Sequence, residues 1–323
     1  MKETLEKAPQ KKSKSISDTL ILFLITFALL VFFSFRSQNF FTYGNISTML
    51  NNMVIAGIIA IAMTPLIVAR GLDISFGASL SLSTVMMALL YNRGTNFYFI
   101  LILGVLLPVL IGLINGLLAE YFNLLPLILT LGMSSILIAI GLVFSNGESI
   151  PMLTDPLYIF ATKSFFKIPY PIIVIVVVVL LYWFLLSFTK LGKKIYIIGA
   201  NPVVARLSGI KVRQIKILLY VFTGFITGIA SVIMIALSGI GYVYHGTNLT
   251  LPVLSAIFLG GMSLAGGEGS IWKTLLGTII ITLIFTGLSL MNIQFYFIQI
   301  FQGLALIIIV AIYEIRKNRS IVK

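Results

Sequence analysis

The sequence predicts an all-α polytopic membrane protein with about ten transmembrane helices, and three observations lead to this fold class. Of the 323 residues, 59% are hydrophobic and only 10% are charged, which is too few charges to cover a soluble domain. Apolar runs long enough to cross a bilayer recur along the chain. The cations lie mostly in the polar segments between these runs. Membrane topology and anionic lipid headgroups therefore explain the net charge of +13, and we expect no nucleic-acid partner.

The apolar runs give the predicted helices in chain order. A polar, basic tail, residues 1–18, precedes a first run that lacks the cleavage site of a signal peptide, so we expect an uncleaved anchor. The ten predicted helices cover roughly residues 19–36, 46–69, 73–91, 97–119, 124–145, 170–189, 214–237, 251–264, 273–291 and 294–313. The eighth is short for a full crossing, which leaves a broken or re-entrant element open. The predicted parts are thus the tail 1–18, a transmembrane domain 19–313 and a tail 314–323.

One basic segment, residues 190–216, sets the expected orientation. It carries seven cations and no acid, and a bilayer-length apolar run lies on each side of it. With the N-terminus in the cytoplasm, 18 cations fall on the cytoplasmic side and four on the other, as the positive-inside rule requires. We therefore expect a multi-pass protein of the cell membrane with this segment, and both termini, in the cytoplasm. Arg70, Glu120 and Lys273 fall on the same side.

Motifs of catalysis and of energy coupling are missing from the sequence. It contains no P-loop, no H-E-x-x-H motif, no carboxylate pair at helical spacing and no cysteine. Of the nine acids, Asp73, Glu120 and Glu268 lie at predicted helix boundaries, and none lies at the middle of a predicted span. Buried carboxylates at the bilayer midplane are the usual mark of ion-coupled carriers. We therefore expect a non-enzymatic transport subunit without a cofactor of its own, which takes its energy from another protein.

Polar residues interrupt the apolar spans at a few places. In RGLDISFG, Arg70 and Asp73 could pair across a turn, and Asp73 or Ser75 could cap the next helix or lie near a pathway. The amides Asn51, Asn52 and Asn115 either bond across helices or line a polar cavity. Two G-x-x-x-G spacings, at 112–116 and 224–228, predict close helix packing.

Three loops have open interpretations. The outer segment 146–169 is either a plain loop or a lid and docking surface for an external binding protein. His245, in the next outer loop, is the single histidine and cannot form a metal site without partners. The glycine-rich stretch GGMSLAGGEGS, residues 260–270, permits a sharp turn or close approach of two backbones.

Three sequence blocks resemble one family, the ribose-type sugar ABC importer permeases. GLDISFGASLSLS resembles the family's G-[IL]-D-[IL]-S-x-G-[SA] signature, and GANPVVARLSGIKVRQIKILLYVFTG resembles its G-x-N-x-x-A-x-x-[SA]-G-[IV]-x-V-x-x-x-K block. LGGMSLAGGEGSIWKTLLGTIIITLIFTGLSLM resembles a third, glycine-rich block. The three blocks follow the family's order and spacing, and the resemblance covers most of the chain from about residue 45 to 313. Arg70 stands where the family commonly has glycine, Glu268 stands where it often has a cation, and Thr286 and Ser289 replace asparagines.

The resemblance implies a type II importer with two permease subunits, identical or paralogous, and two cytoplasmic ATPase subunits that bind ATP and magnesium. An extracytoplasmic solute-binding protein would deliver a sugar or a sugar-like solute such as autoinducer-2. By the same resemblance, the coupling helix that contacts the ATPase lies around residues 200–211. The residues expected to serve this coupling are Gly199, Asn201, Ala205, Arg206, Gly209 and Lys211. The sequence agrees, since Asn201 and Pro202 favour a helix start and Gly209 a helix end.

A neutral solute needs hydrogen bonds rather than a counter-charge along its pathway. We therefore expect Asn51, Asn52 and Asn115, with Asp73 and Ser75, to contribute to that pathway. Two related classes remain as alternatives, namely a nucleoside or a branched-chain amino-acid ABC permease. An ion-coupled secondary carrier is a third, and a non-transporting membrane anchor is a fourth.

Overall fold

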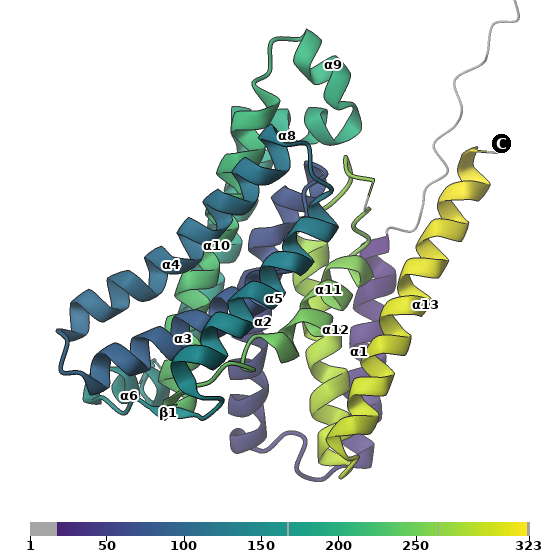
Figure 1. Ribbon diagram of the computed structural model, residues 1–323. Helices are drawn as coiled ribbons and strands as arrows, with labels where there is room; N and C mark the ends of the chain where they lie inside the picture. Colours follow the sequence, from purple (N-terminus) through teal and green to yellow (C-terminus); the bar gives the residue numbers. More distant parts are fainter. Residues whose placement is uncertain (1–17, 167, 264, 322–323) are drawn as a thin grey trace, which may run out of the picture.

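The computed structural model describes residues 18–166, 168–263 and 265–321, and these form a bundle of helices (Figure 1). The ten predicted helices correspond to α1 (Asp18–Arg36), α2 (Tyr43–Val68), α3 (Phe76–Asn92), α4 (Phe97–Tyr121), α5 (Pro126–Ser145), α7 (Tyr170–Phe188), α10 (Val212–Ser238), α11 (Thr250–Leu259), α12 (Ile271–Leu290) and α13 (Phe295–Ile321). Three further helices lie in the loops: α6 (Asp155–Thr162), α8 (Lys190–Ala200) and α9 (Pro202–Leu207). Helix α13 extends past the predicted end at residue 313, while most of the N-terminal tail lies outside the described residues.

Seven of the described helices are long and apolar enough to cross a membrane: α1, α2, α4, α5, α7, α10 and α12. Helix α3 and the apolar parts of α11 and α13 are shorter. The chain is therefore an all-α, multi-pass membrane protein, as its composition predicts.

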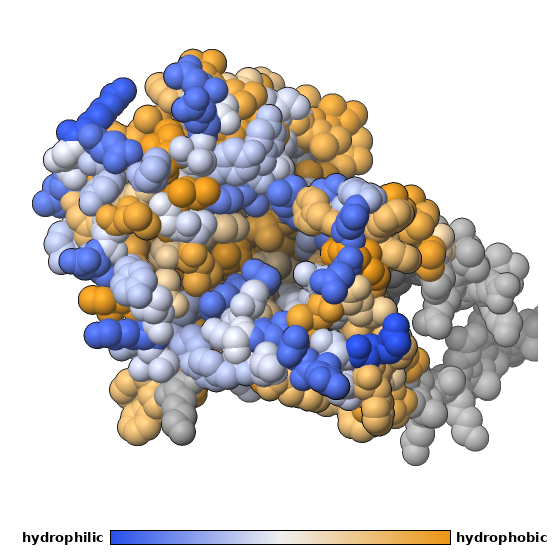
Figure 2. All heavy atoms as spheres, turned by 90° about the horizontal axis from the view of Figure 1, so that it is seen from below, coloured by the Kyte–Doolittle hydropathy of each residue, from blue (hydrophilic) through white to orange (hydrophobic). Residues whose placement is uncertain are grey.

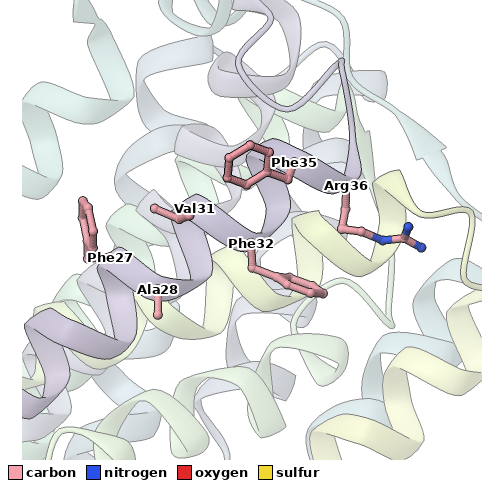
Figure 3. A pocket seen from close by; sticks show the side chains of 6 residues that line it. All are labelled: Phe27, Ala28, Val31, Phe32, Phe35 and Arg36. Carbon is pink, nitrogen blue, oxygen red and sulfur yellow. The ribbon is translucent and has the colours of Figure 1, made fainter.

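Helix α2 is the centre of the bundle. Every residue from Val54 to Val68 is buried, and the helix contacts α7, α10, α11 and α12 (Figure 1). A helix that is apolar on all sides is expected in the interior of a large bundle. Helix α1 lies at the periphery against α12. Its outer surface has a shallow apolar groove lined by Phe27, Ala28, Val31, Phe32, Phe35 and Arg36 (Figure 3).

The two G-x-x-x-G pairs pack against each other, as predicted. A methyl group at Gly112 would overlap the carbonyl oxygen of Tyr220, and one at Gly224 would overlap that of Pro108. Gly116 and Gly228 likewise face the backbone of the opposite helix. Helices α4 and α10 therefore touch through their backbones along a long interface, which side chains at these positions would prevent.

The eighth predicted helix, 251–264, is α11, which ends at Leu259, and a non-helical segment precedes it. Between α10 and α11 the chain forms a short strand, β4 (Ile240–Gly241), and a single 3-10 turn, η1 (Thr247–Leu249). This stretch runs beside α3, where Gly241 packs on Thr84 and Gly246 on Gly77. The Gly246 N–H donates to the Ser81 hydroxyl at 2.8 Å. Helix α3 thus packs closely against this non-helical segment, and its Ser81 hydroxyl accepts a hydrogen bond from one backbone N–H of the segment.

The segment 146–169, which is predicted to lie outside, contains regular elements. It holds α6 and three short strands, β1 (Ile150–Pro151), β2 (Ser164–Phe165) and β3 (Ile168–Pro169). Strand β1 pairs antiparallel with β4, and β2 pairs with β3. Figure 2 shows this end, called the β1 end below, with hydrophilic residues spread over its face and hydrophobic residues around its rim.

The opposite end, called the α9 end below, carries α8 and α9 (Figure 1). The first turn of α1 and the end of α13 lie at this same end. Arg70, Glu120 and Lys216 also lie here, as the threading from charge predicts, because Arg70 bonds to α8 and Glu120 pairs with Lys216. Which end faces the cytoplasm follows from the charge distribution, and it remains a prediction.

Candidate functional site

The loop between α7 and α10 forms two helices that turn back over the end of the bundle. Helix α8 is amphipathic, with Ile195 and Ile198 fully buried and Lys190, Lys193 and Lys194 exposed on one face. The Thr189 hydroxyl accepts the Gly192 N–H at 3.0 Å and starts the helix. The apolar spacing of residues 191, 195 and 198 is the sequence signal by which α8 could have been predicted.

Helix α9 begins and ends where the sequence predicts. The Asn201 side chain accepts the N–H groups of Val203 and Val204 at 2.9 and 3.2 Å, and Pro202 occupies the first turn. At the other end Gly209 has a φ of +76°, and the Ile210 N–H reaches back to the Ala205 carbonyl at 3.0 Å. This is a Schellman motif, which uses glycine in the left-handed conformation. A bulky residue at 209 would therefore strain the end of α9.

The surface of α9 is unusual for a segment outside the membrane spans. Ala205 is fully buried, whereas Val203, Val204 and Leu207 are exposed, Leu207 to 84%. Arg206 and Lys211 are exposed beside them. Three apolar side chains with adjacent cations form a surface suited to a protein partner. Sequence reasoning selected Arg206 and missed these three apolar residues.

The end of α8 meets two other loops at what we call the α8 junction, residues 68–70, 199–200 and 266–269. The Arg70 guanidinium donates to the carbonyl oxygens of Gly199 (Nε, 2.7 Å) and Ala200 (3.0 Å). The Gly267 N–H donates to the Val68 carbonyl at 2.9 Å. Backbones approach so closely at this junction that a methyl group on Gly199 would overlap both Val68 and Gly267. The second and third sequence blocks that resemble the permease family thus meet in space, against the residues directly before the first block.

Arg70 contacts α8 and does not pair with Asp73, so the suggested pairing across the turn is wrong. The physical reason is that Arg70 follows α2 at a φ of +63°, which directs its side chain to the carbonyl end of α8. A non-glycine residue in this conformation costs about 1–2 kcal/mol. Tyr196 adds another link, because its hydroxyl donates to the Gly269 carbonyl at 2.9 Å, and burial raises the pKa of its phenol.

Asp73, Ser75 and Asn115 come together in one buried cluster. The Asp73 carboxylate accepts the Ser75 N–H at 2.8 Å and the Ser75 hydroxyl at 2.6 Å. The Asn115 amide donates to the Ser75 hydroxyl at 2.8 Å, while its own oxygen has no partner. The cluster lies toward the α9 end of the bundle, so Asp73 is buried without being at the centre of a span.

Asn51 and Asn52 lie apart from this cluster, in the first half of α2. Asn52 is exposed, and Asn51 is half-buried with a side-chain oxygen that has no hydrogen-bond partner. Of the five pathway candidates, the structure therefore groups three and places two on another part of the bundle.

Helix α10 is fixed at its start by an ion pair between Lys216 and Glu120, the side chains of which are 14% and 10% exposed. Arg213 lies over the Tyr121 ring at 5.8 Å. Both contacts tie the end of α4 to the start of α10. The basic loop 190–216 is thus anchored at two places, at Gly199 and Ala200 by Arg70 and at Lys216 by Glu120 of α4.

Removing one partner of this ion pair should destabilise the protein. Glu120→Gln leaves the Lys216 ammonium largely buried without its counter-charge, and we expect a loss of about 3 kcal/mol in the free energy of unfolding. Replacing both residues, as Glu120→Leu with Lys216→Met, should recover part of the lost free energy of unfolding. Thermal unfolding in detergent measures this, with Glu148→Gln at the exposed β1 end as the control. Equal stability of Glu120→Gln and wild type would contradict the expectation.

Seven apolar helices in the described part of the chain and a loop anchored at the end of the bundle are the features of a multi-pass membrane protein, and the comparisons with known proteins give its class. Residues 45–311 match the family of permease components of branched-chain amino acid transport systems, and the chain belongs to this family. It is 32% identical over 290 residues to the ribose import permease of Bacillus subtilis, covering 89% of this chain and 90% of that protein. No solved structure matches the chain.

Two further relatives agree with this class. The ribose import permease of Escherichia coli K12 is 30% identical over 310 residues, covering 95% of this chain and 94% of the relative. The autoinducer-2 import permease of Yersinia enterocolitica is 30% identical over 278 residues, covering 84% of each chain. The chain is therefore a transport permease subunit.

Proposed function

We propose that this chain is the membrane-spanning permease of an ATP-binding-cassette importer for a sugar or a sugar-like solute. The observation that carries the proposal is the similarity to ribose and autoinducer-2 import permeases along 84–95% of the chain. These relatives are 30–32% identical to the chain, so the solute class is proposed and the particular sugar is left to experiment.

The energy would come from separate ATPase subunits, which bind ATP and magnesium, and α9 is the proposed contact. Helix α9 presents Val203, Val204 and Leu207 at the end of a loop that is anchored to α2 and α4. An apolar surface on an anchored helix can bury area on a partner and pass its displacement to the bundle. The proposed coupling residues are Gly199, Asn201, Ala205, Arg206, Gly209 and Lys211. The α9 end, with both termini, would then lie in the cytoplasm.

The other proposed partners follow from the same assignment. A second permease subunit would complete the pathway, and a solute-binding protein would dock at the β1 end, where α6 and the paired strands form a structured surface. For the pathway we propose Asn51 and Asn52 as polar lining, because Asn52 is exposed and the Asn51 oxygen is unpartnered. Asp73, Ser75 and Asn115, which bond to one another, would hold the turn between α2 and α3 next to the pathway.

Reconstitution tests the function. The permease is placed in liposomes with a candidate ATPase and a candidate binding protein, and uptake of labelled ribose, autoinducer-2 and leucine is measured with and without ATP. We expect ATP-dependent uptake of a sugar-like solute that requires the binding protein. Uptake driven by an ion gradient without ATP would contradict the proposal.

One observation favours a second candidate. The matching family is described by branched-chain amino acid transport, so a branched-chain amino acid is the alternative solute. ATP-dependent leucine uptake without sugar uptake would establish this alternative and leave the importer assignment intact.

A further inference from the structure

We propose that Arg70 is a positioning residue that holds α8 and α9 in a fixed place relative to the turn between α2 and α3. The inference rests on the proposed function for its consequence, since α9 is the proposed ATPase contact. Its geometry is independent of that function.

Arg70 contacts the C-terminal end of α8, where free carbonyl groups need hydrogen-bond donors. The last carbonyl groups of a helix have no partner within the helix, and they carry the negative end of its dipole. Arg70 donates from Nε to Gly199 at 2.7 Å and from a terminal nitrogen to Ala200 at 3.0 Å. The guanidinium therefore binds two carbonyl groups at the end of α8 and supplies a positive charge there.

Arg70 also stands where glycine is the ordinary residue. Ala69 ends α2, and the Gly71 N–H returns to Leu66 at 2.8 Å while the Arg70 N–H returns to Ile67 at 2.9 Å. This is a Schellman motif with arginine at its left-handed position, at a φ of +63°. The same motif at the end of α9 uses Gly209. A strained residue in a motif that glycine forms without strain indicates that the side chain has a role.

The surroundings leave room for this side chain. Gly266, itself at a φ of +76°, lies against the Arg70 side chain, and a methyl group there would overlap the Arg70 Cγ. Gly267 lies against Ala200 and donates to Val68. Small residues on both sides thus let the arginine stem pass between the two loops and reach α8.

The turn that follows Arg70 is itself fixed to the rest of the bundle. The Tyr220 hydroxyl of α10 bonds to both the N–H and the carbonyl of Leu72, at 3.4 and 3.2 Å. Asp73 holds Ser75, which begins α3. A displacement of α8 therefore reaches α3 and α10 through Arg70 and this turn.

Spin labels can measure the effect directly, because the chain has no cysteine of its own. Ser208→Cys, after α9, and Arg93→Cys, at the far end of α3, are labelled, and their distance distribution is recorded by pulsed electron resonance. We expect Arg70→Gly to broaden the distribution and Arg70→Lys, which retains the charge, to restore it in part. Asn123→Gly is the matched control, since exposed Asn123 is also left-handed after a helix, at a φ of +53°.

The same substitutions, without the labels, are assembled with the ATPase and the binding protein. Arg70→Gly should lower solute-stimulated ATPase activity about ten-fold relative to basal activity, the factor expected for the loss of a charged hydrogen bond. Thermal stability should change little, because glycine relieves the backbone strain. An unchanged distance distribution would overturn the proposal, and a broadened one with full stimulation would overturn its consequence for coupling. If wild type itself shows no stimulation but Arg70→Gly broadens the distribution, the positioning is supported and the proposed function fails.

Discussion

Leu207→Glu is expected to abolish ATP-driven uptake while the permease still inserts and folds. Leu207 is 84% exposed at the end of α9, so the substitution disturbs no internal packing. On a partner surface the change removes about 1.5–3 kcal/mol of apolar burial and adds a charge that must be desolvated. Affinity for the ATPase should fall by about 100-fold or more. Co-purification of the ATPase with the permease, followed by uptake in liposomes, measures both effects.

Two further substitutions serve as controls for this result. Leu153→Glu makes the same change at the β1 end, where Leu153 is 75% exposed, and should leave ATPase binding intact. Arg206→Glu should weaken binding less and make it sensitive to salt, as expected for a charge at the edge of an interface. Normal ATPase binding by Leu207→Glu would remove α9 from the contact.

Gly199→Ala should destabilise the protein strongly, although it adds only one methyl group. The added methyl would overlap the Val68 carbonyl oxygen and the Gly267 backbone, and neither can move aside as a side chain can. Overpacking of this kind costs about 3 kcal/mol, and the loss should appear as a lower midpoint of thermal unfolding in detergent. Because Gly199 also accepts from Arg70, uptake should fall with it.

The control is Gly44→Ala in the first turn of α2, where nothing lies within 4 Å of the added methyl. We expect no loss of stability there, because alanine favours the helix over glycine. Equal unfolding midpoints for Gly199→Ala and wild type would show that the three loops of the α8 junction separate easily.

The transmembrane helices could be predicted because a long run of apolar residues indicates a segment that lies in lipid rather than in water. The run predicted at 170–189 is α7 (Tyr170–Phe188), and the first run is α1 (Asp18–Arg36). Lipid satisfies no backbone group, so an apolar run of this length has few options other than a helix. The eighth predicted helix was recognised as short for a full crossing, and α11 (Thr250–Leu259) has only ten residues. Helices α6 and α8 were not placed, because polar loops carry no such constraint.

The residues of the candidate site could be predicted where they have a local role in the backbone, such as starting or ending a helix. Asn201 and Gly209 have local roles, as helix start and helix end, and the sequence shows both. Arg70 could not be placed in this way, because its partners lie 129 and 130 residues away in the chain. The meeting of the second and third sequence blocks likewise depends on how the helices pack. The grouping of Asp73 with Asn115 depends on it too.

The non-helical segment between α10 and α11 has a mechanical consequence. A continuous helix transmits a push along its axis because each turn is bonded to the next. Between Ser238 and Thr250 that series of bonds is interrupted, and the segment is held instead by glycine contacts and the Ser81 hydroxyl on α3. Helix α11 is therefore joined to α10 through contacts with α3, and a push along α10 does not pass to α11 along one helix axis.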